Sequence, residues 1–153
     1  MENKIAYTFN EIEQHINDLV YKIKESKNRF TKIVTLTKGG LIPARLIARD
    51  LEIDEIYVMG IKLYTLENTA TPEPIIYQRL DGDFKQYDKI LLIDDIVDSG
   101  DSIKYVKHYI ENMEHKCCNI KIASVFYKKK SKIAPDFYSK VVDNEEWVVF
   151  PWE

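Results

Sequence analysis

Apolar residues follow two patterns along the chain, and these patterns predict two kinds of element. In residues 10–28 they recur three or four positions apart, which predicts an amphipathic helix with Asn10 as its N-cap and Glu13 three residues later. Residues 89–93, KILLI, instead form a continuous aliphatic run. Such a run is typical of a strand that is covered on both faces.

Segments of the two kinds alternate along the rest of the chain. The pattern predicts further helices at 41–51 and 101–114, strands at 32–37, 56–64, 75–80 and 120–127, and short β-like pieces near 138–143 and 146–150. Strands that alternate with helices predict right-handed crossovers and a mainly parallel sheet, so the predicted fold class is α/β. In such sheets ligands bind beyond the carboxyl ends of the strands.

Length and composition limit the functions that the chain can have. The 153 residues suit one domain with a hydrophobic core, and the net charge of −3 argues against broad nucleic-acid binding, which needs a basic surface. Apolar stretches are far shorter than the roughly 18 residues of a membrane span, and no signal segment is expected. The adjacent Cys117 and Cys118 suggest a reduced, cytoplasmic setting.

Three of the predicted strands end in residues with unusual chemistry. TKGG (37–40) follows the first, IDDIVDSGDS (93–102) the second and FYKKK (126–130) the third. Because the carboxyl ends of parallel strands meet at one edge of a sheet, these segments are expected to lie close together. This convergence is the first indication of a ligand site.

The acidic segment after residue 93 suits a hydroxyl-rich ligand that carries a metal ion. Asp94 and Asp95 are consecutive, so on a strand end they point to opposite sides, and the sequence leaves open which of them faces the ligand. A carboxylate can accept hydrogen bonds from two neighbouring hydroxyls of a ribose. Mg²⁺ also suits carboxylates in combination with phosphate oxygens.

The segment continues with DSGDS (98–102), which has the composition of a phosphate-binding loop at the start of a helix. Ser99 and Ser102 offer hydroxyl donors, and Gly100 allows a ligand to approach the backbone closely. The helix end adds N–H donors and a positive dipole. A ribose 5-phosphate has the matching layout of hydroxyls and phosphate.

Two simpler interpretations compete with a ligand site here. In the first, the carboxylates only end the strand, and Ser99 or Asp101 caps the following helix. In the second, the acidic strand belongs to a Walker-type nucleotide site, but that site needs the pattern GxxxxGK[ST], which the sequence lacks. The combination of acids, serines and glycine directly after an aliphatic strand favours a ribose phosphate site.

These motifs together resemble a known family. ILLIDDIVDSGDS (90–102) is similar to the phosphoribosyl pyrophosphate (PRPP) motif of type I phosphoribosyltransferases. VTLTKGGLIPARLIARDL (34–51) and EEWVVFPWE (145–153) are similar to segments of the bacterial xanthine-guanine branch, and the likeness runs over most of the chain. The resemblance implies one domain over residues 1–153, in which a mainly parallel sheet is flanked by helices and carries a small hood from the chain ends.

The resemblance also implies which residues bind PRPP. They are Lys38, Gly39, Gly40, Asp94, Asp95, Ser99, Gly100, Asp101 and Ser102. In the family the first three bind pyrophosphate, and Lys38 replaces the usual arginine, which keeps the charge but loses the bidentate fork. Asp95 is the implied contact of Mg²⁺. Asp101 stands in the 5′-phosphate loop where the related enzyme has glycine, and its role is left open.

The resemblance to the family also implies which residues act in catalysis and which bind the base. Asp98 stands where the family places the carboxylate that accepts the N7 proton of the purine and supports the positive charge developing at C1 of the ribose. Lys128 matches the lysine that donates to the 6-oxo group, and a group that only donates is mismatched to the 6-amino group of adenine. Trp147 matches the aromatic residue that stacks on the base, with Val148 beside it.

Three further expectations concern a lid over this site, the rest of the lysine run and the assembly of the protein. Residues 62–74 would form a lid over the reacting centre, where Leu63 replaces the serine common in the family. Lys129 and Lys130, the rest of the lysine run, are expected to be solvated. The resemblance also implies a homodimer or a homotetramer.

The predicted function is transfer of the phosphoribosyl group from PRPP to N9 of a 6-oxopurine, with Mg²⁺ as cofactor. Guanine and xanthine are the leading bases, followed by hypoxanthine. One alternative is an enzyme of the same fold that uses another acceptor, against which Lys128 and Trp147 argue. The other is a PRPP-binding regulator without catalysis that binds RNA or a protein, against which the net charge and Asp98 argue.

Overall fold

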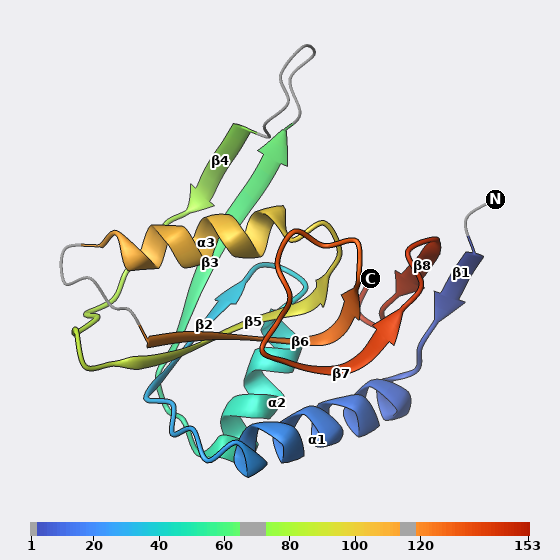
Figure 1. The fold of residues 1–153 in the computed structure, drawn as a ribbon, viewed down its shortest axis with the longest axis horizontal. Coiled ribbons are helices and arrows are strands. Elements are labelled where there is room, and N and C mark those ends of the chain that lie inside the picture. Colours follow the sequence, from blue (N-terminus) through green and yellow to red (C-terminus); the bar gives the residue numbers. More distant parts are fainter. Residues whose placement is uncertain (1–2, 65–72, 114–118) are drawn as a thin grey trace.

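A six-stranded, mostly parallel sheet forms the centre of the molecule (Figure 1). The computed structural model describes residues 3–64, 73–113 and 119–153. The strands, in the sheet order β4-β3-β2-β5-β6-β7, span Glu73–Gln78 (β4), Ile56–Tyr64 (β3), Lys32–Leu36 (β2), Lys89–Val97 (β5), Asn119–Lys128 (β6) and Phe137–Val142 (β7). Only β3 and β4 pair in antiparallel fashion, so the carboxyl ends of β2, β5 and β6 meet at one edge.

Helices cover both faces of this sheet (Figure 1). The helices span Phe9–Glu25 (α1), Leu41–Leu51 (α2) and Asp101–Glu111 (α3). In β5, Leu91 and Ile93 pack in the core beneath α1 and α2, whereas Ile90 and Leu92 pack in the core beneath α3. All four side chains are fully buried, which explains why this strand is continuously apolar. The predicted α/β fold is therefore confirmed.

Strand β5 continues beyond its aliphatic run, to Val97 instead of residue 93. The reason is the length of its neighbour, because β6 pairs with β5 as far as Val97 opposite Tyr127. Backbone pairing does not depend on the polarity of the side chains, so two aspartates can lie within a ladder. The acidic residues therefore belong to the sheet itself.

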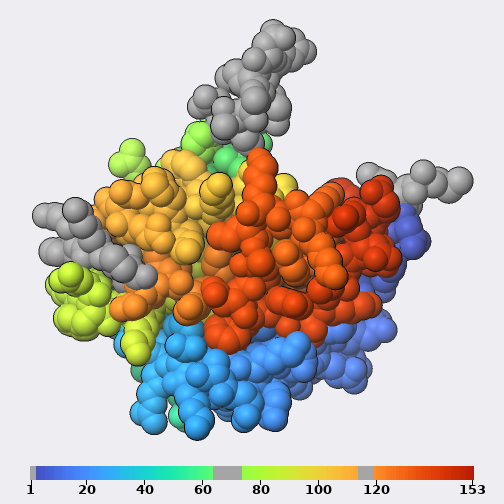
Figure 2. Space-filling view, viewed as in Figure 1, coloured from blue at the N-terminus to red at the C-terminus, as the bar shows by residue number. Residues whose placement is uncertain are grey.

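The two ends of the chain form a second sheet. β1 (Asn3–Ala6) and β8 (Glu146–Val149) pair in parallel, with Lys4 opposite Trp147. Figure 2 shows the blue N-terminal segments lying against the red C-terminal ones on this side of the molecule. The expected hood from the chain ends is thus present. β1 itself was not predicted, because its four residues carry no readable period.

Helix α1 begins with a different cap from the one predicted. The hydroxyl of Thr8 accepts a hydrogen bond from the Glu11 N–H at 3.2 Å, and the Glu11 carboxylate accepts one from the Thr8 N–H at 2.7 Å. This capping box satisfies two N–H groups that the helix leaves without partners. Asn10 lies inside the first turn, so its assignment as the N-cap is wrong.

Several expectations fall on segments outside the described residues. Most of the predicted lid, residues 62–74, lies there, and only its ends belong to β3 and β4, which pair as far as Tyr64 opposite Glu73. Cys117 and Cys118 also lie there. In the part of the chain that the structure describes, no helix is long and apolar enough to cross a membrane.

Candidate active site

The three segments predicted to converge do meet at the carboxyl edge of the sheet. Gly39, after β2, lies against Asp95 of β5, and a Cβ atom added to this glycine would be 2.2 Å from Asp95 Oδ2. At the end of β6, Lys128 Nζ donates to Asp98 Oδ2 at 3.1 Å. The edge therefore combines a glycine-rich loop, carboxylates and a lysine.

Asp94 and Asp95 form a pair of partly buried carboxylates within β5. The Asp95 N–H donates to Asp94 Oδ1 at 2.9 Å, and the Ile96 N–H donates to Asp95 Oδ1 at 2.7 Å. Burial and the charge of Asp95 raise the pKa of Asp94 well above its ordinary value, and burial raises the pKa of Asp95. Among the described residues no basic side chain forms an ion pair with either.

The two carboxylates face different parts of the edge, as expected for neighbours on a strand. Asp95 lies against Gly39 of the loop after β2. Asp94 lines a small pocket with the loop that leads into α3. Of the two, Asp95 is therefore the one beside the predicted pyrophosphate loop.

The loop after β2 packs tightly on the strand ends. A Cβ atom at Gly40 would lie 2.2 Å from Thr35 Oγ1, so a larger residue would not fit there. The peptide bond between Thr37 and Lys38 is cis. The Lys38 side chain is exposed at this edge, so its ammonium is accessible to a ligand.

The loop between β5 and α3 encloses a pocket of about 110 Å³. Its lining includes Asp94, Ser99, Gly100 and Ser102. Gly100 has a φ of 82°, a left-handed conformation that favours glycine. Ser99 Oγ accepts from the backbone N–H of Asp101 at 3.2 Å, where α3 begins. The pocket thus joins a carboxylate to hydroxyls at the positive end of a helix, which is the layout expected for a ribose phosphate.

The loop after β6 packs against this β5–α3 loop. The backbone N–H of Lys132 donates to Ser99 O at 2.9 Å, and its Nζ donates to Asp101 Oδ1 at 2.7 Å. An added Cβ atom at Gly100 would lie 2.3 Å from Ser131 Oγ. The hydrogen bond from Lys132 lowers the pKa of Asp101 below its ordinary value. The carboxylate whose role the sequence left open is therefore an ionised partner of Lys132.

Asp98 has one lysine at each carboxylate oxygen. Lys128 Nζ lies 3.1 Å from Oδ2 and Lys130 Nζ lies 3.0 Å from Oδ1. Lys128 is only 4% exposed, and it also donates to the backbone oxygen of Asn144 at 3.3 Å. Lys129 and Lys130 are exposed, as expected, but the ammonium of Lys130 is paired with Asp98 and is not simply solvated.

A second pocket, of about 200 Å³, lies beside Asp98. It is lined by Asp98, Lys128, Lys130, Asn144, Glu145, Glu146 and Trp147. Trp147 is 49% exposed, so its indole is available for stacking. Val148 is buried in the core with α1, so its side chain does not face this pocket and only its backbone can contribute there. The alternation of side chains along a strand explains the difference.

Sequence reasoning missed three residues that shape this edge, namely Lys130, Lys132 and Asn144. Asn144 Oδ1 accepts from the Lys130 N–H at 3.2 Å, so this residue ties the loop after β6 to the turn before β8. For the two lysines the available signal was that residues 128–132 contain four lysines, of which 128, 130 and 132 alternate.

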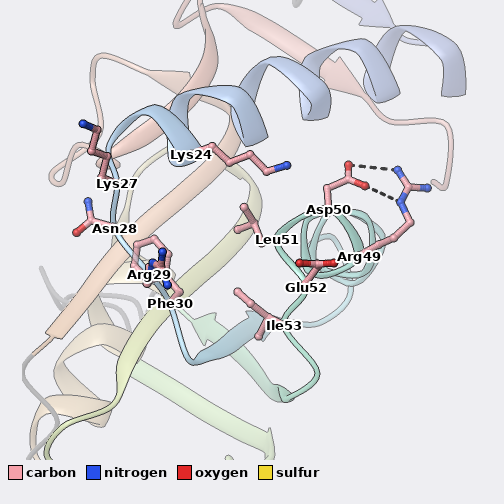
Figure 3. Close-up of a pocket in the computed structure, with 10 residues that line it drawn as sticks. All are labelled: Lys24, Lys27, Asn28, Arg29, Phe30, Arg49, Asp50, Leu51, Glu52 and Ile53. Carbon is pink, nitrogen blue, oxygen red and sulfur yellow. Dashed lines mark hydrogen bonds and ion pairs between the residues drawn. The ribbon is translucent and has the colours of Figure 1, made fainter.

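A separate groove of about 930 Å³ lies where α1 and α2 end and β2 and β3 begin (Figure 3). Its lining is Lys24, Lys27, Asn28, Arg29, Phe30, Arg49, Asp50, Leu51, Glu52 and Ile53. Arg49 and Asp50 pair there at 2.7 Å. Parallel sheets bind ligands at the carboxyl ends of their strands, and this groove lies at the amino ends of β2 and β3, so it is not the candidate site.

Comparison with known proteins agrees with this geometry. A family model described as the phosphoribosyl transferase domain matches residues 6–153. The chain belongs to this family. Among curated phosphoribosyltransferases, the xanthine-guanine phosphoribosyltransferase of Desulfotalea psychrophila is 32% identical over 127 residues, which cover 83% of this chain and 72% of that protein.

Two solved structures are similar to nearly the whole chain. A purine phosphoribosyltransferase from Pyrococcus horikoshii superposes with a TM-score of 0.82 at 29% identity, covering 98% of this chain and 94% of that one. A hypothetical protein from Neisseria gonorrhoeae, solved with bound ppGpp, superposes with a TM-score of 0.85 at 26% identity, covering 100% and 90%. The type I phosphoribosyltransferase fold predicted from the sequence is therefore confirmed.

Proposed function

We propose that this phosphoribosyltransferase moves the phosphoribosyl group of PRPP to N9 of a 6-oxopurine and releases pyrophosphate. Guanine and xanthine are the leading acceptors, followed by hypoxanthine, and residues 1–153 act as one domain. The observation that carries the proposal is the contact of the buried Lys128 with Asp98, in a pocket that Trp147 also lines. This contact supports the proposal because the lysine proposed to read the purine then lies next to the carboxylate proposed to accept its proton.

The PRPP half of the site supplies donors for the pyrophosphate and for the 5′-phosphate. In the loop after β2, the Gly40 N–H already donates to Leu36 O at 3.1 Å, which leaves the Gly39 N–H and the Lys38 ammonium for pyrophosphate. The 5′-phosphate lies in the β5–α3 loop, where the first N–H groups of a helix point at an anion. The carboxylate of Asp94, which lines the same pocket, accepts from the ribose hydroxyls.

The base half selects a purine with an oxygen at position 6. On base binding, Lys128 exchanges part of its contact with Asp98 for a hydrogen bond to O6, which a buried ammonium can only donate. Adenine offers an amino group there and is therefore rejected. Trp147 stacks on the ring, and the backbone oxygen of Val148 accepts from the group at position 2.

The reaction needs a carboxylate beside the imidazole side of the purine. N9 forms a bond to C1 of the ribose while the bond from C1 to the pyrophosphate oxygen breaks, and its electron pair leaves with pyrophosphate. Asp98 accepts the proton from N7 as positive charge builds on the base. When Lys128 turns to O6, Lys130 still holds the other oxygen of Asp98 in place.

Mg²⁺ fits the donor set formed by Asp94 and Asp95. The described residues contain no cluster of three or more side chains that could hold a metal ion, so these two carboxylates would need oxygens from the substrate. One or two carboxylates combined with phosphate oxygens are the ligands that Mg²⁺ prefers. When bound, Mg²⁺ neutralises the charge of the leaving pyrophosphate. Asp95, beside the loop after β2, is the proposed metal contact.

The proposal is tested by a comparison of acceptor bases. The protein is incubated with Mg²⁺, PRPP and guanine, xanthine, hypoxanthine, adenine or uracil in turn, and nucleotide formation is measured. We expect product with the 6-oxopurines alone. Absence of product with all three at high enzyme concentration would overturn the proposed function, and product mainly with adenine would overturn the role of Lys128. An Asp98→Asn variant with full activity would remove Asp98 from the mechanism.

A second candidate function is regulation of this enzyme by a bound guanosine polyphosphate. The observation that favours it is the similar protein from Neisseria gonorrhoeae, which was solved with bound ppGpp. Such a ligand combines guanine with phosphates and would occupy the same two pockets. Adding ppGpp to the assay is expected to raise the apparent KM for PRPP, and an unchanged KM at saturating ppGpp contradicts this candidate.

The remaining partner assignments are also part of the proposal. The enzyme binds no nucleic acid, acts in the cytoplasm and assembles as a homodimer or a homotetramer. Light scattering of the purified protein measures the assembly, and a monomer at assay concentration would contradict it.

A further inference from the structure

Lys132, in the loop after β6, forms an ion pair with Asp101, the first residue of α3. Lys132 Nζ lies 2.7 Å from Asp101 Oδ1, and the side chains are 56% and 23% exposed, respectively. Ion pairs this close to solvent contribute little to folding stability. We therefore expect this ion pair to affect ligand binding more than folding stability.

A carboxylate at this position opposes the proposed ligand. Asp101 begins α3, between Gly100 and Ser102, which both line the pocket proposed for the 5′-phosphate. The hydrogen bond from Lys132 lowers its pKa, so it carries a full negative charge at neutral pH. A phosphate dianion beside this carboxylate would be repelled, and the helix dipole offsets only part of that repulsion.

The fold holds the ammonium of Lys132 against this carboxylate. The Lys132 N–H donates to Ser99 O at 2.9 Å, which fixes the loop after β6 on the β5–α3 loop. Ser131 Oγ donates to Ile133 O at 2.7 Å and lies close to Gly100. Lys104, on α3, also acts on Asp101 electrostatically, but Lys132 makes the direct contact.

We propose that Lys132 is a positioning residue for the 5′-phosphate. It neutralises Asp101, and a phosphate dianion can then bind beside that carboxylate. The inference rests on the proposed PRPP site and extends it to a residue that need not touch the substrate. It also explains how this chain accommodates an aspartate within a phosphate-binding loop.

A double-mutant cycle that removes the charges of Lys132 and Asp101 tests the inference. The affinity for PRPP with Mg²⁺ is measured by calorimetry, and KM and kcat by turnover, for wild type, Lys132→Met, Asp101→Asn and the double variant. Lys132→Met is expected to weaken PRPP binding about tenfold, because the carboxylate then acts on the phosphate unopposed. The double variant is expected to return to within about twofold of wild type, because the repelling charge is gone. KM for guanine is expected to stay unchanged.

Lys129→Met is the matched control, because Lys129 is exposed and belongs to the same lysine run. It is expected to bind PRPP like wild type. Lys132→Arg keeps the charge and is expected to retain most of the affinity. Thermal melts of all variants show whether any loss of binding reflects a loss of folded protein.

Three results would overturn the inference. In the first, Lys132→Met binds PRPP like Lys129→Met. In the second, the double variant binds as weakly as Lys132→Met, which means that Lys132 acts by another route. In the third, wild type does not bind PRPP at all, which overturns the proposed function as well. If wild type binds PRPP without forming nucleotide, only the proposed function fails, and the calorimetric cycle still decides the role of Lys132.

Discussion

Individual charges at the carboxyl edge of the sheet fall into two groups. Asp98 and Asp101 each meet a lysine from the loop after β6. Asp94 and Asp95, in contrast, meet no basic side chain among the described residues, and burial raises the pKa of both. The first group is held in place before substrate arrives, whereas the second group gains most from an incoming cation.

Lys130 is predicted to position Asp98 for catalysis. Lys130→Met is expected to lower kcat about tenfold with little change in KM, because the carboxylate loses one of its two anchors. Lys130→Arg is expected to restore part of kcat. Steady-state kinetics with guanine and PRPP measures both parameters, with Lys129→Met as the control. Equal kcat values for Lys130→Met and Lys129→Met would show that the contact has no catalytic effect.

The ionised carboxylate of Asp94 is predicted to destabilise the ligand-free fold and to strengthen PRPP binding. The pKa of this carboxyl is raised in the folded protein, so its ionisation destabilises the fold, and stability falls as pH rises from the ordinary carboxyl value through the raised one. Asp94→Asn is therefore expected to raise the Tm of the ligand-free protein by a few degrees at pH 8 and much less near pH 4, while weakening PRPP binding. Melting curves across this range measure the effect, and a lower Tm at pH 8 would contradict it.

Helix α1 provides a prediction at the scale of one element. Thr8→Ala removes the hydroxyl that caps the helix and is expected to lower the free energy of unfolding by about 1 kcal/mol. Asn10→Ala, inside the first turn, is the control and is expected to be neutral or slightly stabilising. Urea unfolding measures both. A larger loss for Asn10→Ala would show that the helix begins elsewhere in solution.

Elements whose signal is local could be predicted from the sequence. Residues 41–51 were predicted as a helix and α2 has these bounds, because a glycine pair directly precedes the segment and the segment itself has an apolar face. The end of β5 and the whole of β1 could not be predicted, because distant partners decide them. β5 extends to Val97 because β6 is long, and β1 exists because β8 lies beside it.

The same distinction applies to the candidate site. The loop after β2 and the β5–α3 loop were recognisable, since their glycines, serines and acids are adjacent in the chain. The pairing of Lys130 with Asp98 and of Lys132 with Asp101 was not, because it depends on how the turn after β6 folds back. The burial of Val148 follows from strand alternation once β8 is known.

The whole molecule divides the proposed chemistry between two sheets. The loops that would bind PRPP follow β2 and β5 of the large sheet, and Lys128 ends β6 of the same sheet, whereas Trp147 is carried by β8 of the hood. β8 has β1 as its only partner among the described strands. Purine affinity is therefore expected to depend on the hood more strongly than PRPP affinity does.

Deletion of residues 1–6 tests this division. Without β1, strand β8 loses its ladder and Trp147 loses its support, so guanine binding is expected to weaken more than PRPP binding. Calorimetry with each ligand measures the two affinities, and a melt confirms that the protein remains folded. An equal loss of both affinities would mean that the hood and the large sheet do not act independently.

The position of Glu153 has a consequence for metal binding at this edge of the sheet. Burial raises the pKa of Asp95 and the negative charge of Glu153 adds to this effect, so Glu153 lies within electrostatic reach of the proposed metal contact. An affinity tag fused after Glu153 would place new charges, and in a histidine tag new metal ligands, beside that carboxylate. Activity and magnesium titrations are therefore best made on protein that carries no tag next to Glu153.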